Sequence, residues 1–108
     1  DYHMVITGSH LSPRLALNQN PPENFCRPAV DPMLRSVAAV YGRKVLVAIL
    51  TGMGTDGARG SQVVVEAGGA VIAQDEATSV VWGMPAATAK LGLCHAVLPL
   101  KEIGPWLR

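Results

Sequence analysis

The residues of this chain best suited to chemistry lie in one glycine-rich turn. Gly52, Gly54 and Gly57 follow an apolar stretch over residues 45–50, and a single carboxylate, Asp56, comes directly before the third glycine. A turn of this composition between a strand and a helix suits two unrelated kinds of chemistry. Backbone N–H groups at the start of the helix can bind a nucleotide phosphate. Alternatively, the turn can present one buried acid to a catalytic histidine.

The nucleotide interpretation has support from spacing. The pattern Gly-x-Gly-x-x-Gly, with Asp75 about twenty residues further on, fits the dinucleotide-binding fingerprint. The Asp56 carboxylate opposes it, because a negative charge about 5 Å from a phosphate costs on the order of 3 kcal/mol at an effective dielectric constant near 20. That cost corresponds to roughly a hundredfold in affinity. The alternative function is thus a nucleotide-binding α/β module built on the turn Gly52-Met53-Gly54-Thr55-Asp56-Gly57.

The acid interpretation uses the same placement differently. The N-terminus of a helix stabilises a carboxylate, and a triad aspartate must stay ionised while it orients an imidazole. In this interpretation Asp56 is the triad acid and the Met53 N–H donates to an oxyanion. A plain helix N-cap is the third interpretation of Asp56.

The surrounding pattern predicts the elements that position the turn. Asp31 is expected as a helix N-cap, Pro32 as the first helical residue and Gly42 as the end of that helix. The predicted elements are a hairpin (2–7 and 15–18), a helix (31–41), a strand (45–50), a helix (57–67), a strand (70–74), a helix (85–91), a strand (96–98) and a helix (100–108).

Alternation of strands and helices predicts an α/β fold. We expect a parallel, doubly wound sheet with helices on both faces and an N-terminal hairpin. Ligands of such sheets bind beyond the carboxyl ends of the strands. The loops 51–57 and 75–84 are expected at that edge.

Composition narrows the function classes. The chain has 108 residues, enough for one domain, and a net charge of +1 with scattered Lys and Arg, so no nucleic-acid partner is expected. No apolar run reaches the roughly 18 residues of a membrane span, and no signal peptide opens the chain. Cys26 and Cys94 lack metal-ligand spacing and are expected as free thiols of a reducing compartment.

Four motifs in a fixed order carry a resemblance to a known family. They are PENFCRPAVDPM at 22–33, LTGMGTDGA at 50–58, VIAQDEATSVVWGMP at 71–85 and AVLPL at 96–100. The chain resembles the C-terminal half of the catalytic domain of chemotaxis receptor methylesterases, the CheB family, and the resemblance covers nearly all of it.

The resemblance implies an esterase. The family hydrolyses glutamyl methyl esters on the cytoplasmic helices of methyl-accepting chemotaxis receptors, and some members deamidate glutamines. It uses a Ser-His-Asp triad and no metal or organic cofactor. The triad aspartate of the family matches Asp56, and its oxyanion-hole amide matches Met53. The implied location is cytoplasmic, without direct membrane insertion.

The family's serine and histidine motifs do not occur in this chain. The resemblance therefore implies that residues 1–108 are the C-terminal part of a single catalytic domain, with the N-terminal part and a receiver domain absent. We expect this chain alone to be inactive, to pair with the N-terminal half, and to expose a sheet edge prone to association. A catalytically dead piece that only docks on receptors is a further hypothesis.

Other residues carry weaker expectations. Ser79 is the only serine expected at the functional edge, and it is interpreted mainly as a loop hydroxyl. Three histidines are interpreted as structural or solvated: His3, His10 and His95. Five residues are interpreted as either substrate-facing groups or structural anchors: Arg27, Gln74, Asp75, Trp82 and Met84.

Overall fold

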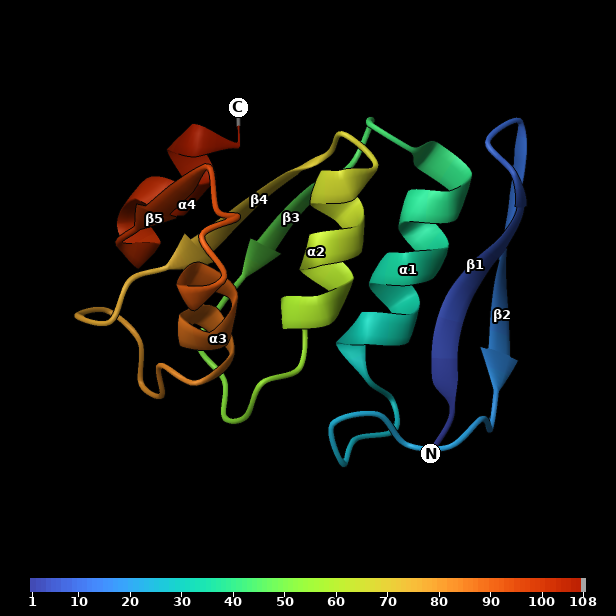
Figure 1. Cartoon of the computed structure of the whole chain (residues 1–108), viewed down its shortest axis with the longest axis horizontal. Coiled ribbons are helices and arrows are strands. Elements are labelled where there is room, and N and C mark those ends of the chain that lie inside the picture. The colour runs from blue at the N-terminus through green and yellow to red at the C-terminus, as the bar shows by residue number, and fades with distance from the viewer. Residues whose placement is uncertain (108) are drawn as a thin grey trace.

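A computed structural model describes residues 1–107. The elements follow the predicted order (Figure 1). They are β1 (His3–Ser9), β2 (Ser12–Asn18), α1 (Val30–Tyr41), β3 (Leu46–Ile49), α2 (Ala58–Glu66), β4 (Ala70–Gln74), α3 (Met84–Lys90), β5 (Ala96–Leu98) and α4 (Leu100–Trp106).

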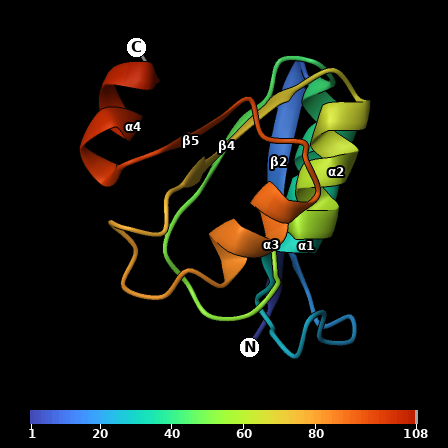
Figure 2. The ribbon, with the colours of Figure 1, turned by 60° about the vertical axis from the view of Figure 1, so that its left-hand side comes forward.

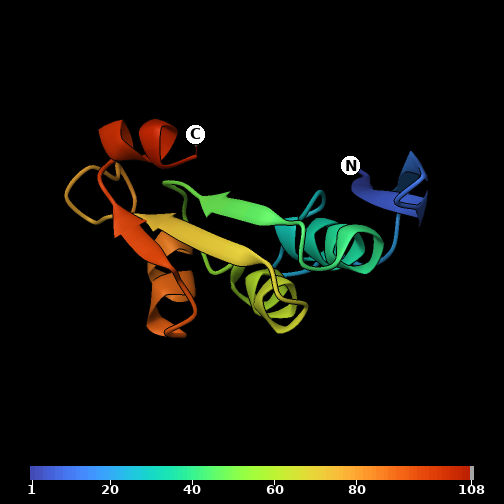
Figure 3. The ribbon, with the colours of Figure 1, turned by 90° about the horizontal axis from the view of Figure 1, so that it is seen from above.

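The centre of the fold is a three-stranded parallel sheet in the order β3-β4-β5. Helices α2 and α3 lie on one side of this sheet and α4 lies on the other (Figure 3). The middle strand is the most deeply buried, and its residues Val71, Ile72 and Ala73 are fully covered. Continuous apolar sequence is typical of parallel strands packed on both faces. The predicted α/β class, with helices on both faces, is confirmed.

The N-terminal hairpin forms a second, separate sheet. Strands β1 and β2 are antiparallel, and helix α1 lies between β1 and α2 (Figure 1). The Ile6 N–H donates to Ser36 Oγ at 2.9 Å and so joins β1 to α1. On its other side, α1 contributes Leu34 and Ala38 to a core that includes Val47 and Val64. Helix α1 therefore connects the hairpin to the parallel sheet.

Some predicted boundaries were wrong. The hairpin strands extend to Ser9 and Ser12, because backbone pairing continues up to the tight turn. Helix α1 begins at Val30 with Ala29 as its N-cap, so Asp31 is not the N-cap and Pro32 is not the first helical residue. Helix α4 contains Pro105 and ends at Trp106; its predicted end at Arg108 lies outside the described residues.

Three loops lie at one end of the molecule, as two views show (Figures 1 and 2). They are the β2–α1 loop (19–29), the β3–α2 loop (50–57) and the β4–α3 loop (75–83). This end holds the carboxyl ends of β3 and β4 and the N-termini of α1 and α2. It is the edge where parallel α/β sheets bind ligands.

Candidate active site

Asp56 lies in the β3–α2 loop and is almost fully buried, with 6% of its surface exposed. Its carboxylate accepts three hydrogen bonds from the β2–α1 segment. Oδ2 accepts from the Val30 N–H at 2.7 Å. Oδ1 accepts from the Asp31 N–H at 3.1 Å and from Asn24 Nδ2 at 3.0 Å. The side chain is thereby fixed in one orientation.

Asp56 caps a helix, but a different one from the helix that follows it. Val30 and Asp31 are the first residues of α1, and their N–H groups have no partner within that helix. The Asp56 carboxylate satisfies both and interacts with the positive end of α1. The expectation that α2, the helix following the turn, would hold this acid was wrong, because α2 has Gly57 as its N-cap residue.

Asp31, in the first turn of α1, in turn caps the start of α2. Its fully buried carboxylate accepts from the Gly57 N–H at 3.0 Å and from the Gly60 N–H at 2.7 Å. The two helices therefore exchange caps, with Asp56 on α1 and Asp31 on α2. Gly60 permits this close contact, because a Cβ atom there would lie 2.8 Å from the Cβ of Leu34.

The exchange places two buried carboxylates close together, and one amide group joins them. Asn24 Nδ2 donates to Asp31 Oδ2 at 2.7 Å and to Asp56 Oδ1 at 3.0 Å. Two negative charges about 5 Å apart repel by on the order of 3 kcal/mol at an effective dielectric constant near 20. The backbone donors of both helices and the Asn24 amide offset this repulsion. Sequence reasoning did not single out Asn24, although it lies inside the motif at 22–33.

Met53 lies in the same loop as Asp56, three residues before it. Its side chain is largely exposed, and no hydrogen bond from its N–H is found within residues 1–107. The neighbouring backbone is held by the β4–α3 loop: the Gly52 N–H donates to Val81 O at 2.9 Å, and the Met84 N–H donates to Gly52 O at 2.8 Å. Gly83 allows the two loops to meet, since a Cβ there would lie 2.8 Å from Gly54 N. The Met53 amide is thus free to donate on a fixed backbone.

The β4–α3 loop is anchored by residues for which the sequence allowed two roles, a substrate-facing group or a structural anchor. Gln74 is buried; its Oε1 accepts from the Thr51 N–H at 2.8 Å, and its Nε2 donates to Thr78 O at 2.8 Å. Trp82 Nε1 donates to Gln74 O at 2.9 Å. The Asp75 carboxylate accepts from the N–H and hydroxyl of Thr78. These contacts make all three side chains loop anchors, and Met84 packs against the core.

No serine or histidine side chain within residues 1–107 donates a hydrogen bond to Asp56. His3 is buried, where Nδ1 accepts from the Ala29 N–H at 3.2 Å and Nε2 donates to Pro21 O at 3.0 Å. Ser79 Oγ donates to Asp75 O. Arg27 binds the Asp1 carboxylate at 2.7 Å and the carbonyl groups of the β2–α1 loop. These residues fix local structure and do not complete a triad.

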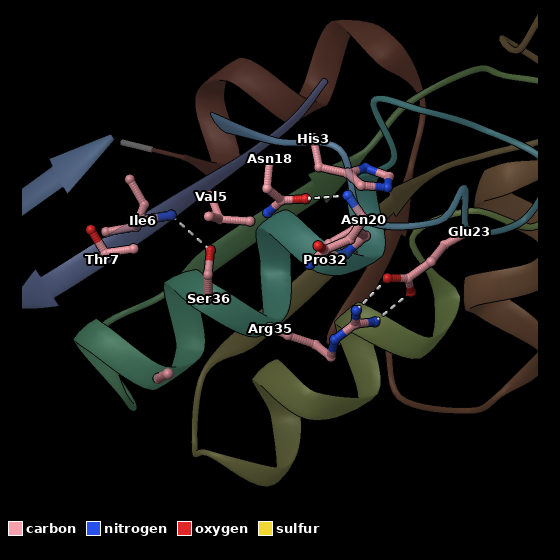
Figure 4. Close-up of a pocket in the computed structure, with 11 residues that line it drawn as sticks. His3, Val5, Ile6, Thr7, Asn18, Asn20, Glu23, Pro32, Arg35 and Ser36 are labelled. Carbon is pink, nitrogen blue, oxygen red and sulfur yellow. Dashed lines mark hydrogen bonds and ion pairs between the residues drawn. The ribbon is translucent and has the colours of Figure 1, made fainter. Parts of the chain in front are cut away.

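A cavity of about 440 Å³ lies away from Asp56, between the hairpin and α1 (Figure 4). Arg35 and Glu23 form a two-pronged ion pair at its edge, with N–O distances of 2.7 and 2.5 Å. The hydrogen bond from Arg35 lowers the pKa of Glu23, and the same bond raises the pKa of Arg35. Glu23 and Arg35 at the edge of this cavity are already paired with each other, and Asp56 does not line it, so the loop of Asp56 is kept as the candidate site.

Two properties of the described residues concern partners. No helix within residues 1–107 is both long and apolar enough to cross a bilayer. The same residues contain no group of three or more His, Cys, Asp or Glu side chains placed to hold a metal ion. Cys26 and Cys94 are free, and burial raises the pKa of the Cys94 thiol.

Comparisons with known proteins agree on one family. The family model described as CheB methylesterase matches residues 1–107. A protein of Paramagnetospirillum magneticum named protein-glutamate methylesterase/protein-glutamine glutaminase 1 is 66% identical over 107 residues, which are 99% of this chain and 28% of that protein. A Rhodospirillum rubrum protein of the same name is 61% identical, with the same coverage. The chain thus spans little more than a quarter of the length of these relatives.

A solved structure extends the likeness to the fold. The crystal structure of the Thermotoga maritima CheB methylesterase catalytic domain superposes with a TM-score of 0.95 at 38% sequence identity. The match covers 99% of this chain and 57% of that one.

Proposed function

The chain belongs to the CheB methylesterase family, and from this premise we propose that it supplies the triad acid and one oxyanion-hole donor of a serine esterase. The substrates are glutamyl methyl esters on the cytoplasmic helices of chemotaxis receptors. Glutamine side chains are a second substrate class, because the relatives are also named protein-glutamine glutaminases.

The observation that carries this proposal is the state of Asp56. A carboxylate accepts about four hydrogen bonds. Asp56 accepts three from this chain, two at Oδ1 and one at Oδ2. It therefore keeps the capacity to accept one more, from an imidazole N–H. Burial and three fixed donors hold it in the orientation that a triad acid needs.

The reaction follows from this role. A serine supplied by protein outside residues 1–108 attacks the ester carbonyl, and a histidine, also from outside, takes its proton. Asp56 orients that histidine and stabilises the imidazolium, while the Met53 N–H donates to the tetrahedral oxyanion. The histidine then protonates the leaving methoxide, and methanol departs. Water attacks the acyl-enzyme by the same route and releases the glutamate side chain.

We place the groups supplied by other protein at the free edge of β3. Within residues 1–107, β3 pairs only with β4, and Leu46 at its start and Leu50 just after its end are exposed. A parallel strand added at this edge would end beside the β3–α2 loop, where Asp56 and Met53 lie. We assign this edge to the N-terminal half of the same catalytic domain. A receiver domain joined to that half, and a cytoplasmic location, belong to the same proposal.

A chimera tests the proposal. Residues 1–107 replace the matching segment of the Paramagnetospirillum magneticum relative, and methanol release from methylated receptor is measured. We expect activity from the chimera, no hydrolysis by this chain alone, and loss of activity in the Asp56→Asn chimera. An active Asp56→Asn chimera would remove Asp56 from the mechanism. Receptor binding without hydrolysis by the intact chimera would favour a docking role instead.

A further inference from the structure

We infer that Asn24 is a positioning residue for the Asp56 carboxylate, and that it directs the catalytic histidine to Oδ2 of that group. The inference rests on the proposed role of Asp56 as triad acid. Within residues 1–107, Asn24 is the only side chain that donates to Asp56, and the other two donors are backbone N–H groups.

The distribution of donors over the two oxygens carries the argument. Oδ1 accepts from Asn24 Nδ2 and from the Asp31 N–H, so its two lone pairs are engaged. Among residues 1–107, Oδ2 accepts only from the Val30 N–H. Each oxygen of a carboxylate accepts about two hydrogen bonds. Since Asn24 occupies the second site on Oδ1, an imidazole N–H has one place to bind, and that place is on Oδ2.

The second contact of Asn24 fixes its own orientation. Nδ2 also donates to Asp31 Oδ2 at 2.7 Å, so both amide hydrogens are directed at carboxylates. Asp31 is held in turn by the N–H groups of Gly57 and Gly60 at the start of α2. The amide therefore connects the caps of the two helices. A rotation of Asn24 would break a contact with each of them.

The backbone around Asn24 supports a functional role. Glu23 and Cys26 exchange backbone hydrogen bonds across a tight turn, and the two central residues have positive φ, +53° at Asn24 and +65° at Phe25. Asparagine tolerates this left-handed region, whereas phenylalanine rarely adopts it. Within residues 1–107 the Phe25 side chain gains no burial, because it is fully exposed. Strain of this kind persists where the surrounding contacts require the conformation, and here the turn presents the Asn24 amide to Asp56.

The variant Asn24→Gly tests the inference in the full-length chimera. Glycine keeps the left-handed backbone and removes the amide donor. We expect kcat to fall roughly tenfold to a hundredfold, the scale of a small misplacement of a catalytic group, with KM within about twofold. A residue that acts through Asp56 also loses its effect when Asp56 is replaced. In the Asp56→Asn background, Asn24→Gly should therefore leave the residual kcat unchanged.

The control variant is Phe25→Gly. It adds the same backbone freedom at the next residue of the same turn, and within residues 1–107 its side chain is fully exposed. We expect its kcat to stay within about twofold of the parent chimera. A drop equal to that of Asn24→Gly would show that turn flexibility, rather than the amide, sets the rate, and would overturn the inference.

The outcomes separate this inference from the proposed function. An inactive Asp56→Asn chimera together with a fully active Asn24→Gly chimera overturns the inference and leaves the function intact. An active Asp56→Asn chimera overturns both. An equal loss from Asn24→Gly with and without Asp56 shows that Asn24 acts elsewhere. Should Asn24→Gly fail to fold in buffer, the same comparison is made in a stabilising osmolyte such as sucrose, which favours the folded state without adding a charge beside the two carboxylates; an unchanged kcat of the folded variant overturns the inference.

Discussion

Replacing Asp56 with asparagine changes both the stability and the catalysis of the full-length chimera, and the structure gives the size of each effect. An amide has one acceptor oxygen. With that oxygen in the place of Oδ1, it keeps the donors Asn24 and Asp31, and its NH₂ group faces the Val30 N–H. In the flipped orientation two donors are lost instead of one. The less costly arrangement therefore sacrifices the 2.7 Å bond from Val30.

A hydrogen bond to a charged group contributes about 1.5–3 kcal/mol, and the charge at the N-terminus of α1 contributes about 0.3–1 kcal/mol. These two contributions sum to about 4 kcal/mol at most, while relief of the repulsion between Asp31 and Asp56 offsets the weakening of the two remaining bonds, which lose their charged acceptor. A domain of ordinary stability, about 5–15 kcal/mol, stays mostly folded after such a loss. Unfolding therefore reduces the rate by less than about twofold.

The catalytic effect is much larger. Replacing a triad aspartate by asparagine lowers kcat on the order of 10⁴-fold, because the histidine takes the wrong tautomer. We expect that loss in methanol release by the Asp56→Asn chimera, with urea unfolding followed by far-UV circular dichroism as the stability control. Asp31→Asn is the graded comparison. Asp31→Asn should lower the free energy of unfolding by a similar amount but lower kcat only about tenfold. The Asp31 backbone N–H, which donates to the Asp56 carboxylate, is kept by the substitution. The Asp31 side chain affects Asp56 only through Asn24. Rates that fall only in proportion to the unfolded fraction would make Asp56 a structural cap and nothing more.

Three further predictions address packing, pH and the alternative function, each measured in the full-length chimera. Gly60→Ala should lower the free energy of unfolding by about 1–2 kcal/mol, because overpacking against Leu34 outweighs a helix-propensity gain of about 1 kcal/mol; Gly104→Ala, which meets open space, should not destabilise. Arg35→Gln should cost no more than about 1 kcal/mol at neutral pH, since both side chains of the ion pair are partly exposed to solvent. The Arg35 hydrogen bond lowers the pKa of Glu23 from 4.5, so this cost is present above pH 4.5 and disappears as the pH falls through the lowered pKa; a constant difference at all pH values would contradict that assignment. Titration with NAD should show no micromolar binding, and binding that survives Asp56→Asn would favour the nucleotide-binding module.

The fold was predictable where the signals are local. The strands at 70–74 and 96–98 have the predicted bounds, because short apolar runs between turn residues define buried parallel strands. The helix at 58–66 begins within one residue of the predicted position. Prediction failed at Asp31, whose position before a proline is typical of an N-cap. Its side chain instead caps the neighbouring helix α2, and the local sequence pattern does not indicate this contact.

The sequence by itself determined which residues are the candidates for the chemistry. The motif around Met53 and Asp56 places an amide and an acid in one turn after a buried strand, and the same motif indicates the family. These features depend on residues adjacent in the chain, so the sequence alone indicates them.

Only the tertiary structure decided what holds the acid. Asp56 binds the start of α1, about 25 residues earlier in the chain, Asp31 binds the start of α2, and Asn24 joins the two. None of these contacts follows from propensity or spacing. They exist because α1 packs against α2 closely enough for each helix to offer its unpaired N–H groups to a carboxylate of the other.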